Sequence, residues 1–270
     1  GHGPSPLTRA GEEEEMPAAA SSEDLYVPQS AMVIVAHPDD IEYVCAGTLA
    51  LWARGGARLS YVLCTSGEAG IEDPGAGREQ AMAIREAEQR RAAEIVGAEE
   101  VIFLREPDGL LEPSLALRRK LVREIRRFRP EVLICGDPTV VWLGPTLINH
   151  ADHRAAASAA LDAAWPAAGQ PGLFRELELD GLRAHRPRRL YITGWVQPGA
   201  DLRVDVTATL EVKAAALRAH TSQVDGDPLP FLQQWAAANA AGTEAKYAEI
   251  FRVVQFMSDE EWERTRGARG

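Results

Sequence analysis

Two short segments of this 270-residue chain concentrate side chains that can hold a metal ion. The first reads His-Pro-Asp-Asp at positions 37–40, directly after an apolar run, and the second reads Asn-His-Ala-Asp-His at positions 149–153. Two histidines and one carboxylate are the usual protein ligands of a catalytic zinc ion, and they leave coordination positions open for water and substrate. Imidazole and carboxylate groups also suit iron, cobalt and nickel. The sequence alone does not decide which of the two adjacent aspartates would bind the ion.

Each segment also has a purely structural interpretation. Pro38 disfavours the helical conformation at His37, so a helix is expected to begin after that residue, and an aspartate at its start can cap it. In the second segment, His150 could cap a helix and His153 could be a surface histidine. Capping accounts for one aspartate of the first segment, but it explains neither the second aspartate nor His37. The two segments taken together therefore favour a metal site.

The elements predicted around these segments bring them to the same edge of a sheet. Apolar runs predict four strands, at 32–36, 58–65, 101–104 and 131–135. Helices alternate with these strands and are predicted at 40–54, 78–96, 114–128 and 151–164. This alternation is typical of a parallel sheet with helices on both faces and right-handed crossovers. Sites in such folds form beyond the carboxyl ends of the strands, and both segments follow such an end.

The C-terminal part of the chain is expected to add a smaller group of strands and helices. Residues 165–188 contain several prolines and glycines and predict an insertion that resembles a lid. Strands at 189–196 and 201–206 are expected to pair with each other. Further elements are predicted as helices at 207–220 and 228–247 and a strand at 249–256. The domain organisation expected is a disordered tail over 1–28, a single α/β domain over 29–258 and a polar tail over 259–270.

The composition disfavours several classes of function. The net charge of −11 argues against non-specific binding to nucleic acids and to anionic membrane surfaces. The basic run at 118–129 has apolar residues at helical spacing, so its arginines are expected to form the solvated face of an amphipathic helix. No window approaches the roughly 20 apolar residues that a membrane helix needs. The three cysteines lack paired spacing and predict reduced, buried thiols in a cytoplasmic protein.

The segments AHPDDIE (36–42) and NHADH (149–153) together resemble the zinc-dependent de-N-acetylases of the LmbE/PIG-L family. The similarity extends over about residues 31–256 through supporting segments, which are TSGEAG (65–70), AIREAEQRRAAEIVG (83–97), PDG (107–109) and EVKAAALRAHTSQ (211–223). The resemblance implies a Rossmann-like three-layer sandwich with a mainly parallel sheet, joined to a smaller C-terminal portion of strands and helices.

The resemblance also implies a role for individual residues of the two segments. His37, Asp40 and His153 would bind one zinc ion per chain, with other divalent transition metals as alternatives. Asp39 would be the general base that activates a water molecule. His150 would stabilise the oxyanion that forms when this water attacks an amide, and it could protonate the leaving amine.

Further residues are assigned by the same resemblance, with two departures from the family pattern. Asp152 would orient His150. Arg85 and Asp108 occupy positions that some relatives use to hold sugar hydroxyls. The alternatives are a surface salt bridge from Arg85 to a neighbouring glutamate, and turn chemistry for Asp108. Ala151 replaces the proline that is common in the second motif, and Ile148 stands where some relatives place a tyrosine that assists the oxyanion.

These features predict a metal-dependent hydrolase that removes the N-acetyl group from an N-acetylglucosamine-type small-molecule conjugate. The alternatives are an amidase that acts on a larger acyl or thiol conjugate, and a metal-binding protein without catalysis. A nucleotide-binding protein is disfavoured, because the glycines at 67–77 lack phosphate-loop or dinucleotide spacing. We expect no nucleic-acid or membrane partner, and a homo-oligomer is one alternative to a monomer. The loops at 137–149 and 165–188 are expected to shape substrate choice, with apolar residues 140–143 forming a substrate rim or a subunit contact.

Overall fold

The described residues contain seven strands that form one sheet, and this arrangement confirms the predicted α/β fold class. The computed structural model describes residues 26–71, 75 and 77–267, so the tail predicted over 1–28 lies outside the described residues except for its last three. The strands follow the order β3-β2-β1-β4-β5-β7-β6. Their bounds are β1 Ser30–Val35, β2 Arg58–Thr65, β3 Glu100–Glu106, β4 Val132–Cys135, β5 Arg189–Ile192, β6 Leu202–Asp205 and β7 Ala248–Gln255. The first five strands pair in parallel, whereas β7 is antiparallel to β5 and to β6.

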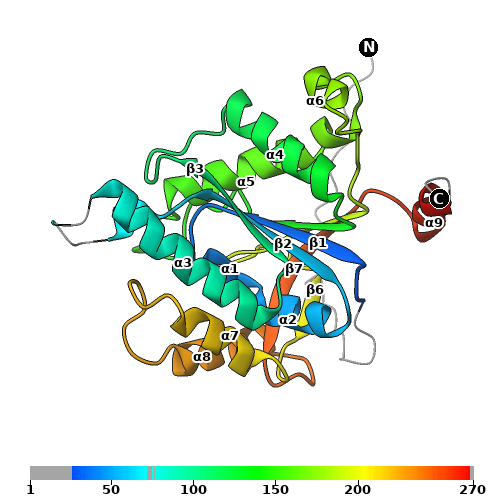
Figure 1. Cartoon of the computed structure of the whole chain (residues 1–270). Coiled ribbons are helices and arrows are strands. Elements are labelled where there is room, and N and C mark those ends of the chain that lie inside the picture. The colour runs from blue at the N-terminus through cyan, green and yellow to red at the C-terminus, as the bar shows by residue number, and fades with distance from the viewer. Residues whose placement is uncertain (1–25, 72–74, 76, 268–270) are drawn as a thin grey trace, which may run out of the picture.

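Helices cover both faces of the sheet (Figure 1). One face carries α4 (Leu115–Phe128) and α5 (Ala151–Ala164). The other face carries α1 (Asp40–Val44), α2 (Ala46–Arg54), α3 (Arg78–Val96) and α7 (Leu210–Arg218), and α8 (Leu229–Asn239) packs against α7. Side chains of a strand point alternately to its two faces, so β1 contributes Met32 and Ile34 to one core and Val33 to the other. Among the described residues, no helix is long and apolar enough to cross a membrane.

The helix predicted at 40–54 is divided into α1 and α2 at Cys45, whose φ is −148°. The cause is a carboxylate from β7. Glu249 accepts hydrogen bonds from the main-chain amides of Gly47 at 2.9 Å and Thr48 at 2.8 Å. A continuous helix would direct these two amides to the preceding turn instead. A Cβ atom at Gly47 would lie 2.9 Å from the side chain of Val206, so glycine is required for this close approach.

The predicted pairing of the strands at 189–196 and 201–206 is wrong, because β7 lies between them. Leu190 of β5 is paired with Val254, and Val204 of β6 is paired with Glu249. β7 carries apolar residues on both faces, as is typical of an interior strand, whereas β6 alternates apolar with charged residues. The short β6 therefore forms the edge of the sheet.

The segment 165–188 does not lie over the carboxyl ends of the strands, as the prediction of a lid required. It contains α6 (Arg175–Leu179), and it is tied to the amino end of β4. His185 is 1% exposed, and its Nε2 lies 2.7 Å from the main-chain oxygen of Pro130. Beyond β7, residues 259–267 form α9 (Asp259–Gly267), in which Trp262 is buried.

Candidate active site and metal centre

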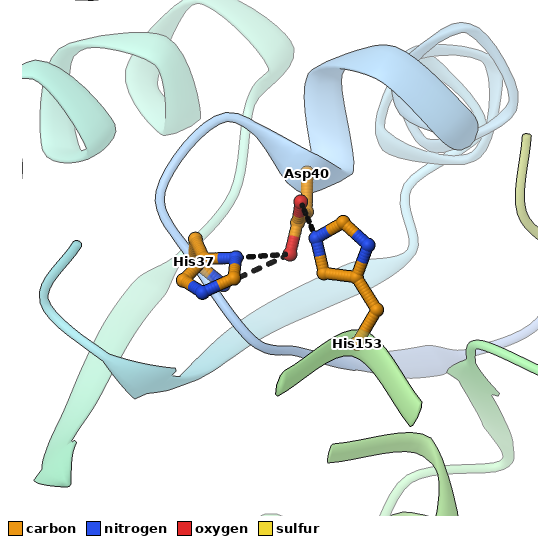
Figure 2. A group of neighbouring side chains, drawn as sticks. All are labelled: His37, Asp40 and His153. Atoms are coloured by element: carbon orange, nitrogen blue, oxygen red, sulfur yellow. Dashed lines mark hydrogen bonds and ion pairs between the residues drawn. The ribbon is translucent and has the colours of Figure 1, made fainter. Parts of the chain in front are cut away.

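Loops at the carboxyl ends of β1, β3 and β4 bring the candidate residues together. His37 follows β1, Asp108 follows β3, and His153 lies in the first turn of α5, after the long loop that leaves β4. Because β1 and β4 are hydrogen-bonded neighbours, the loops that follow them are adjacent in space. Figure 2 shows His37 and His153 on either side of Asp40.

Asp40 contacts both histidines. Its Oδ2 accepts a hydrogen bond from the main-chain amide of His37 at 2.9 Å and lies 3.6 Å from Nδ1 of that residue. Its Oδ1 lies 3.0 Å from Nε2 of His153. Ligands about 2.1 Å from a tetrahedral ion are about 3.4 Å apart, which is close to the two separations seen here. One ligand atom from each of the three residues lies within 4.8 Å of the others, so the set fits one divalent ion.

The charges around these residues favour a cation. Burial alone would raise the pKa of Asp40, but His153 and His37 hold it well below its usual range. Burial lowers the pKa of His37, but hydrogen bonds to Asp108, Asp152 and Asp40 outweigh it and raise this pKa well above its usual value. Asp40 likewise raises the pKa of His153 against the effect of burial. The carboxylates therefore stabilise positive charge at this point, as a proton or as a metal ion.

The ring nitrogen of His37 that faces away from Asp40 contacts two other carboxylates. This nitrogen, Nε2, lies 3.1 Å from Oδ1 of Asp108 and 3.3 Å from Oδ2 of Asp152. Metal-binding histidines commonly donate the second ring N–H to a carboxylate, which fixes the tautomer and the ring orientation. This contact leaves Nδ1 on the side of Asp40 and of the candidate ion.

His153 has an equivalent partner that the sequence analysis missed. Its Nδ1 lies 3.1 Å from Oδ1 of Asn149, and Nδ2 of Asn149 donates to the main-chain oxygen of Val140 at 2.8 Å. The second bond assigns the amide orientation, because it requires Nδ2 to be the donor. Asn149 therefore accepts the Nδ1 hydrogen of His153 and directs Nε2 of that ring to Asp40.

Asp39 lies beside the candidate ligands in a strained conformation. Its φ is 89°, in the left-handed region that residues other than glycine rarely adopt. Its main-chain amide donates to Oε1 of Gln89 at 3.0 Å, and its Oδ2 lies 3.5 Å from Nη2 of Arg85. Burial and the adjacent Asp40 raise the pKa of Asp39 to about 7, against the opposing effect of Arg85. A carboxylate whose pKa lies near neutrality is suited to general-base catalysis.

His150 caps α5 and lies next to both candidate histidine ligands. Its ring centroid is 5.0 Å from that of His37 and 5.4 Å from that of His153. Its Nδ1 accepts a hydrogen bond from the main-chain amide of Asp152 at 3.2 Å. Burial and the charge of His37 lower the pKa of His150. The neutral ring therefore carries its hydrogen on Nε2, from which it can donate to an oxyanion.

The role predicted for Asp152 in orienting His150 stays a prediction: its main-chain amide contacts that ring, while its carboxylate has other partners. It accepts hydrogen bonds from the main-chain amides of Gly109 at 2.7 Å and Leu111 at 3.2 Å, and it contacts His37. Asp152 therefore joins α5 to the loop after β3. It belongs to a second candidate ligand group with His37 and His150, but its oxygens already accept two amides. The group built on Asp40 has the better-placed carboxylate.

Arg85 and Asp108 lie at the site. A surface salt bridge does not describe the contacts of Arg85, and turn chemistry alone does not describe those of Asp108. Arg85 is 3% exposed and donates to the main-chain oxygen of Pro38 at 2.6 Å, which excludes the alternative of a salt bridge at the surface. Within the described part of the chain, its Nε and Nη1 have no hydrogen-bond partner. Asp108 does more than stabilise a turn, because its Oδ2 accepts from the amide of Ala69 at 2.8 Å while Oδ1 contacts His37.

A buried hydrogen-bond network behind Asp39 includes His220, from the segment EVKAAALRAHTSQ (211–223). Gln89, which binds the amide of Asp39, donates through Nε2 to Oε1 of Glu42 at 3.0 Å. Oε2 of Glu42 lies 3.2 Å from Nε2 of His220. His220 is fully buried. Gln89 and Glu42 lie in segments that carry the family resemblance, but the sequence assigned them no role, because their roles depend on contacts between α1, α3 and the residues after α7.

Comparisons with known proteins identify related chains. The family model described as "PIG-L: GlcNAc-PI de-N-acetylase" matches residues 32–164. The chain is 29% identical to a diacetylchitobiose deacetylase of Thermococcus kodakarensis, over 84% of this chain and 83% of that protein. It is 31% identical to a 1D-myo-inositol 2-acetamido-2-deoxy-alpha-D-glucopyranoside deacetylase of Rhodococcus erythropolis, over 73% of this chain and 82% of that protein. Among solved structures, N,N′-diacetylchitobiose deacetylase from Pyrococcus horikoshii has a TM-score of 0.76 at 25% identity, with 84% of each chain covered.

Proposed function

The chain belongs to the PIG-L (LmbE) family of de-N-acetylases, and from this premise we propose that it is a zinc-dependent N-deacetylase. It hydrolyses the acetamido group of an N-acetylglucosamine-type small-molecule conjugate to acetate and a free amine. The two curated relatives named above are deacetylases, and the second acts on a 2-acetamido-2-deoxyglucopyranoside, as its name states. Zinc is the proposed metal because the ligands would be two imidazoles and one carboxylate.

The proposal rests on two residues, Asp39 and His150, that are not needed as metal ligands. His37, Asp40 and His153 suffice to hold one ion. Asp39 and His150 then lie next to that ion without being needed as ligands. A protein that only stored a metal would not need a carboxylate with a pKa near neutrality and a neutral histidine at the same point.

The residues can be assigned to the steps of amide hydrolysis. A bound divalent ion supplies a Lewis acid that polarises the amide carbonyl and lowers the pKa of a water molecule to about 7. Asp39 takes the proton of the attacking water, and Arg85 balances the negative charge of Asp39 before that transfer. His150 donates from Nε2 to the developing oxyanion; loss of one such donor costs on the order of 100- to 1000-fold in rate. Asp39 then donates the proton taken from the water to the amide nitrogen, and the C–N bond breaks to release the free amine.

Metal-dependent acetate release tests the proposal. The purified protein, treated with a chelator and then supplied with zinc, is assayed on N-acetylglucosamine and its methyl glycoside. We expect acetate only after zinc is restored. Acetate release that persists in the chelated protein would contradict the metal mechanism. Release of acid only from larger acyl or thiol conjugates would instead identify a different amidase.

A further inference from the structure

An apolar groove opens beside the candidate metal centre. It has a volume of about 680 Å³, within the range of small-molecule sites. Three segments of the chain supply its apolar lining, which includes Leu147 and Ile148, Trp195 and Val196, and Phe231 and Trp235. His150 and His153 also line it, so the groove is continuous with the site of the proposed chemistry.

The aromatic residues of this groove are held by one another before any ligand binds. Trp195 stacks on Trp235 of α8, with ring centroids 5.0 Å apart and an angle of 17° between the planes. Trp195 also contacts Tyr43 of α1 at 4.9 Å, and Phe231 contacts Trp235 at 6.1 Å. Such a packed cluster is preorganised, and little conformational entropy is lost when a ligand covers it. Phe231 nevertheless remains 47% exposed and Ile148 58% exposed, so apolar surface is available.

The groove has no carboxylate, lysine or arginine among its described lining residues. Its polar members are the amides Asn149 and Gln234 and the two histidines. A phosphate or a carboxylate placed among the aromatic residues, away from the two histidines, would lose its hydration without gaining an opposite charge. An uncharged apolar group gains free energy in the same place, because its burial removes apolar surface from water.

A second, much smaller cavity indicates which side of the amide faces the groove. It has a volume of about 60 Å³ and lies against Asp40 and His153, lined by small or apolar side chains that include Val35, Ala157 and Thr193. It shares His153 and Trp195 with the groove, so the two spaces meet at the candidate metal centre. The small cavity suits a methyl group, and the large one suits a substituent several times that size.

We propose that the groove binds an uncharged alkyl or aryl substituent carried by the sugar, while the small cavity receives the methyl of the acetyl group. The substrate class is therefore an N-acetylglucosaminide with an apolar aglycone. This inference rests on the proposed deacetylase function, since it assigns the two ends of the same substrate.

The ratio of kcat/KM for two glycosides tests the proposal. Acetate release is measured with zinc-loaded protein on the hexyl and the methyl glycosides of N-acetylglucosamine. We expect the hexyl glycoside to be favoured roughly tenfold or more, as one buried methylene already contributes at least tenfold in an apolar pocket. Phe231→Ala and, independently, Ile148→Ser should reduce this ratio to below about threefold. The matched control is Leu179→Ala, since Leu179 is 80% exposed on α6 and does not line the groove, and it should leave the ratio unchanged.

Two further experiments distinguish the proposed occupant of the groove from an acyl chain and from a second copy of the protein. A hexanoyl group in place of acetyl on the methyl glycoside should be hydrolysed more slowly than acetyl, and a preference for hexanoyl would overturn the assignment. Light scattering of the wild type and Phe231→Ala tests whether a second copy covers the groove. A dimer that Phe231→Ala dissociates would overturn the proposal as well.

Binding without turnover separates failure of this inference from failure of the proposed function. Hexyl glucoside, which lacks the acetamido group, should change the tryptophan fluorescence of the protein, and methyl glucoside at the same concentration should not. If no glycoside releases acetate but hexyl glucoside binds, the deacetylase function fails while the apolar groove stands. If all glycosides release acetate at equal kcat/KM, the function stands and this inference is overturned.

Discussion

At the scale of single residues, two adjacent aspartates have different environments. The carboxylate of Asp40 contacts His37 and His153, while Asp39 has a left-handed backbone and contacts Arg85. The hydrogen bond from the Asp39 amide to Gln89 helps to hold that strained conformation. This difference supports a division of roles in which Asp40 binds the ion and Asp39 transfers the proton.

Asp39→Asn tests that division. The amide has nearly the same shape but cannot accept a proton at neutral pH, so we expect kcat to fall on the order of 100- to 10,000-fold, the usual contribution of general-base catalysis. The variant should still contain about one zinc ion per chain, measured by elemental analysis. An active variant would make Asp39 a structural residue, whereas loss of the metal would make it a ligand.

Asn149→Ala tests the partner of His153. Without the oxygen of Asn149, the imidazole is no longer fixed in one tautomer and orientation. We expect the affinity for zinc to fall roughly 10- to 100-fold, as is typical when such a partner is removed. Competition with a chromogenic chelator measures the affinity. Asn239→Ala at the end of α8 is the control, and an equal loss in both variants would contradict the role of Asn149.

At the scale of elements, a buried ion pair joins β7 to α2 and α7. Nζ of Lys213 lies 2.7 Å from Oε1 of Glu249, and both side chains are at most 3% exposed. The same carboxylate binds the amides of Gly47 and Thr48 at the start of α2, where the helix dipole favours negative charge. Because α1 carries Asp40, this junction positions the helix pair on which the candidate site depends.

Lys213→Ala should therefore destabilise the protein. Removal of one partner leaves the charge of Glu249 buried and unpaired, which typically costs about 3–5 kcal/mol in the free energy of unfolding. Chemical denaturation followed by circular dichroism measures this change. Lys246→Ala removes an exposed lysine and should change the free energy of unfolding by less than about 0.5 kcal/mol. Similar small effects for both substitutions would mean that the ion pair is not important for stability.

A buried arginine of α4 helps to hold the segment 165–188 in place. Arg126 is 2% exposed and donates to five main-chain oxygens in that segment, those of Ala167, Ala168, Gln170, Leu173 and Phe174. We expect Arg126→Ala to increase native-state proteolysis within the segment by at least about tenfold, since hydrogen bonds to a charged group contribute about 1.5–3 kcal/mol. The kcat/KM for acetate release should stay within about twofold of the wild type. A changed preference among glycosides would restore the segment as a determinant of substrate choice.

At the scale of the whole molecule, the sheet holds together loops that are distant in sequence. The candidate ligands come from the ends of β1 and β4, and their supporting carboxylates come from the end of β3 and the start of α5. Several carboxylates therefore share one small region in the folded state but not in the unfolded chain. A divalent ion bound there neutralises part of this charge and stabilises the folded state.

Zinc should therefore raise the melting temperature. At a free concentration one hundred times the dissociation constant, the ion adds about 2.7 kcal/mol to the free energy of unfolding. For a domain of this size, that corresponds to roughly 5–10 °C. Differential scanning fluorimetry with and without zinc measures the shift. The double variant His37→Ala/His153→Ala should show no gain, and an equal gain in that variant would place the ion elsewhere.

Local signals in the sequence were enough to predict most of the elements and the chemical types at the site. The helices predicted at 78–96 and 151–164 and the strand at 58–65 have the observed bounds, because their periodicity and their glycine or proline boundaries are local signals. Two histidine-aspartate segments at strand ends indicated a metal site before any contact was known, since parallel strands end at one edge of the sheet.

The partners of these groups depend on contacts that form only in the folded chain. The break at Cys45 follows from Glu249, which is about two hundred residues away in the chain, and the carboxylate of Asp152 contacts His37, which is more than one hundred residues away. The placement of β7 inside the sheet and of 165–188 at its amino edge likewise depends on packing between distant segments. Local propensity carries no information about such contacts, because their free energy arises only when the folded chain brings the two partners together and removes them from water.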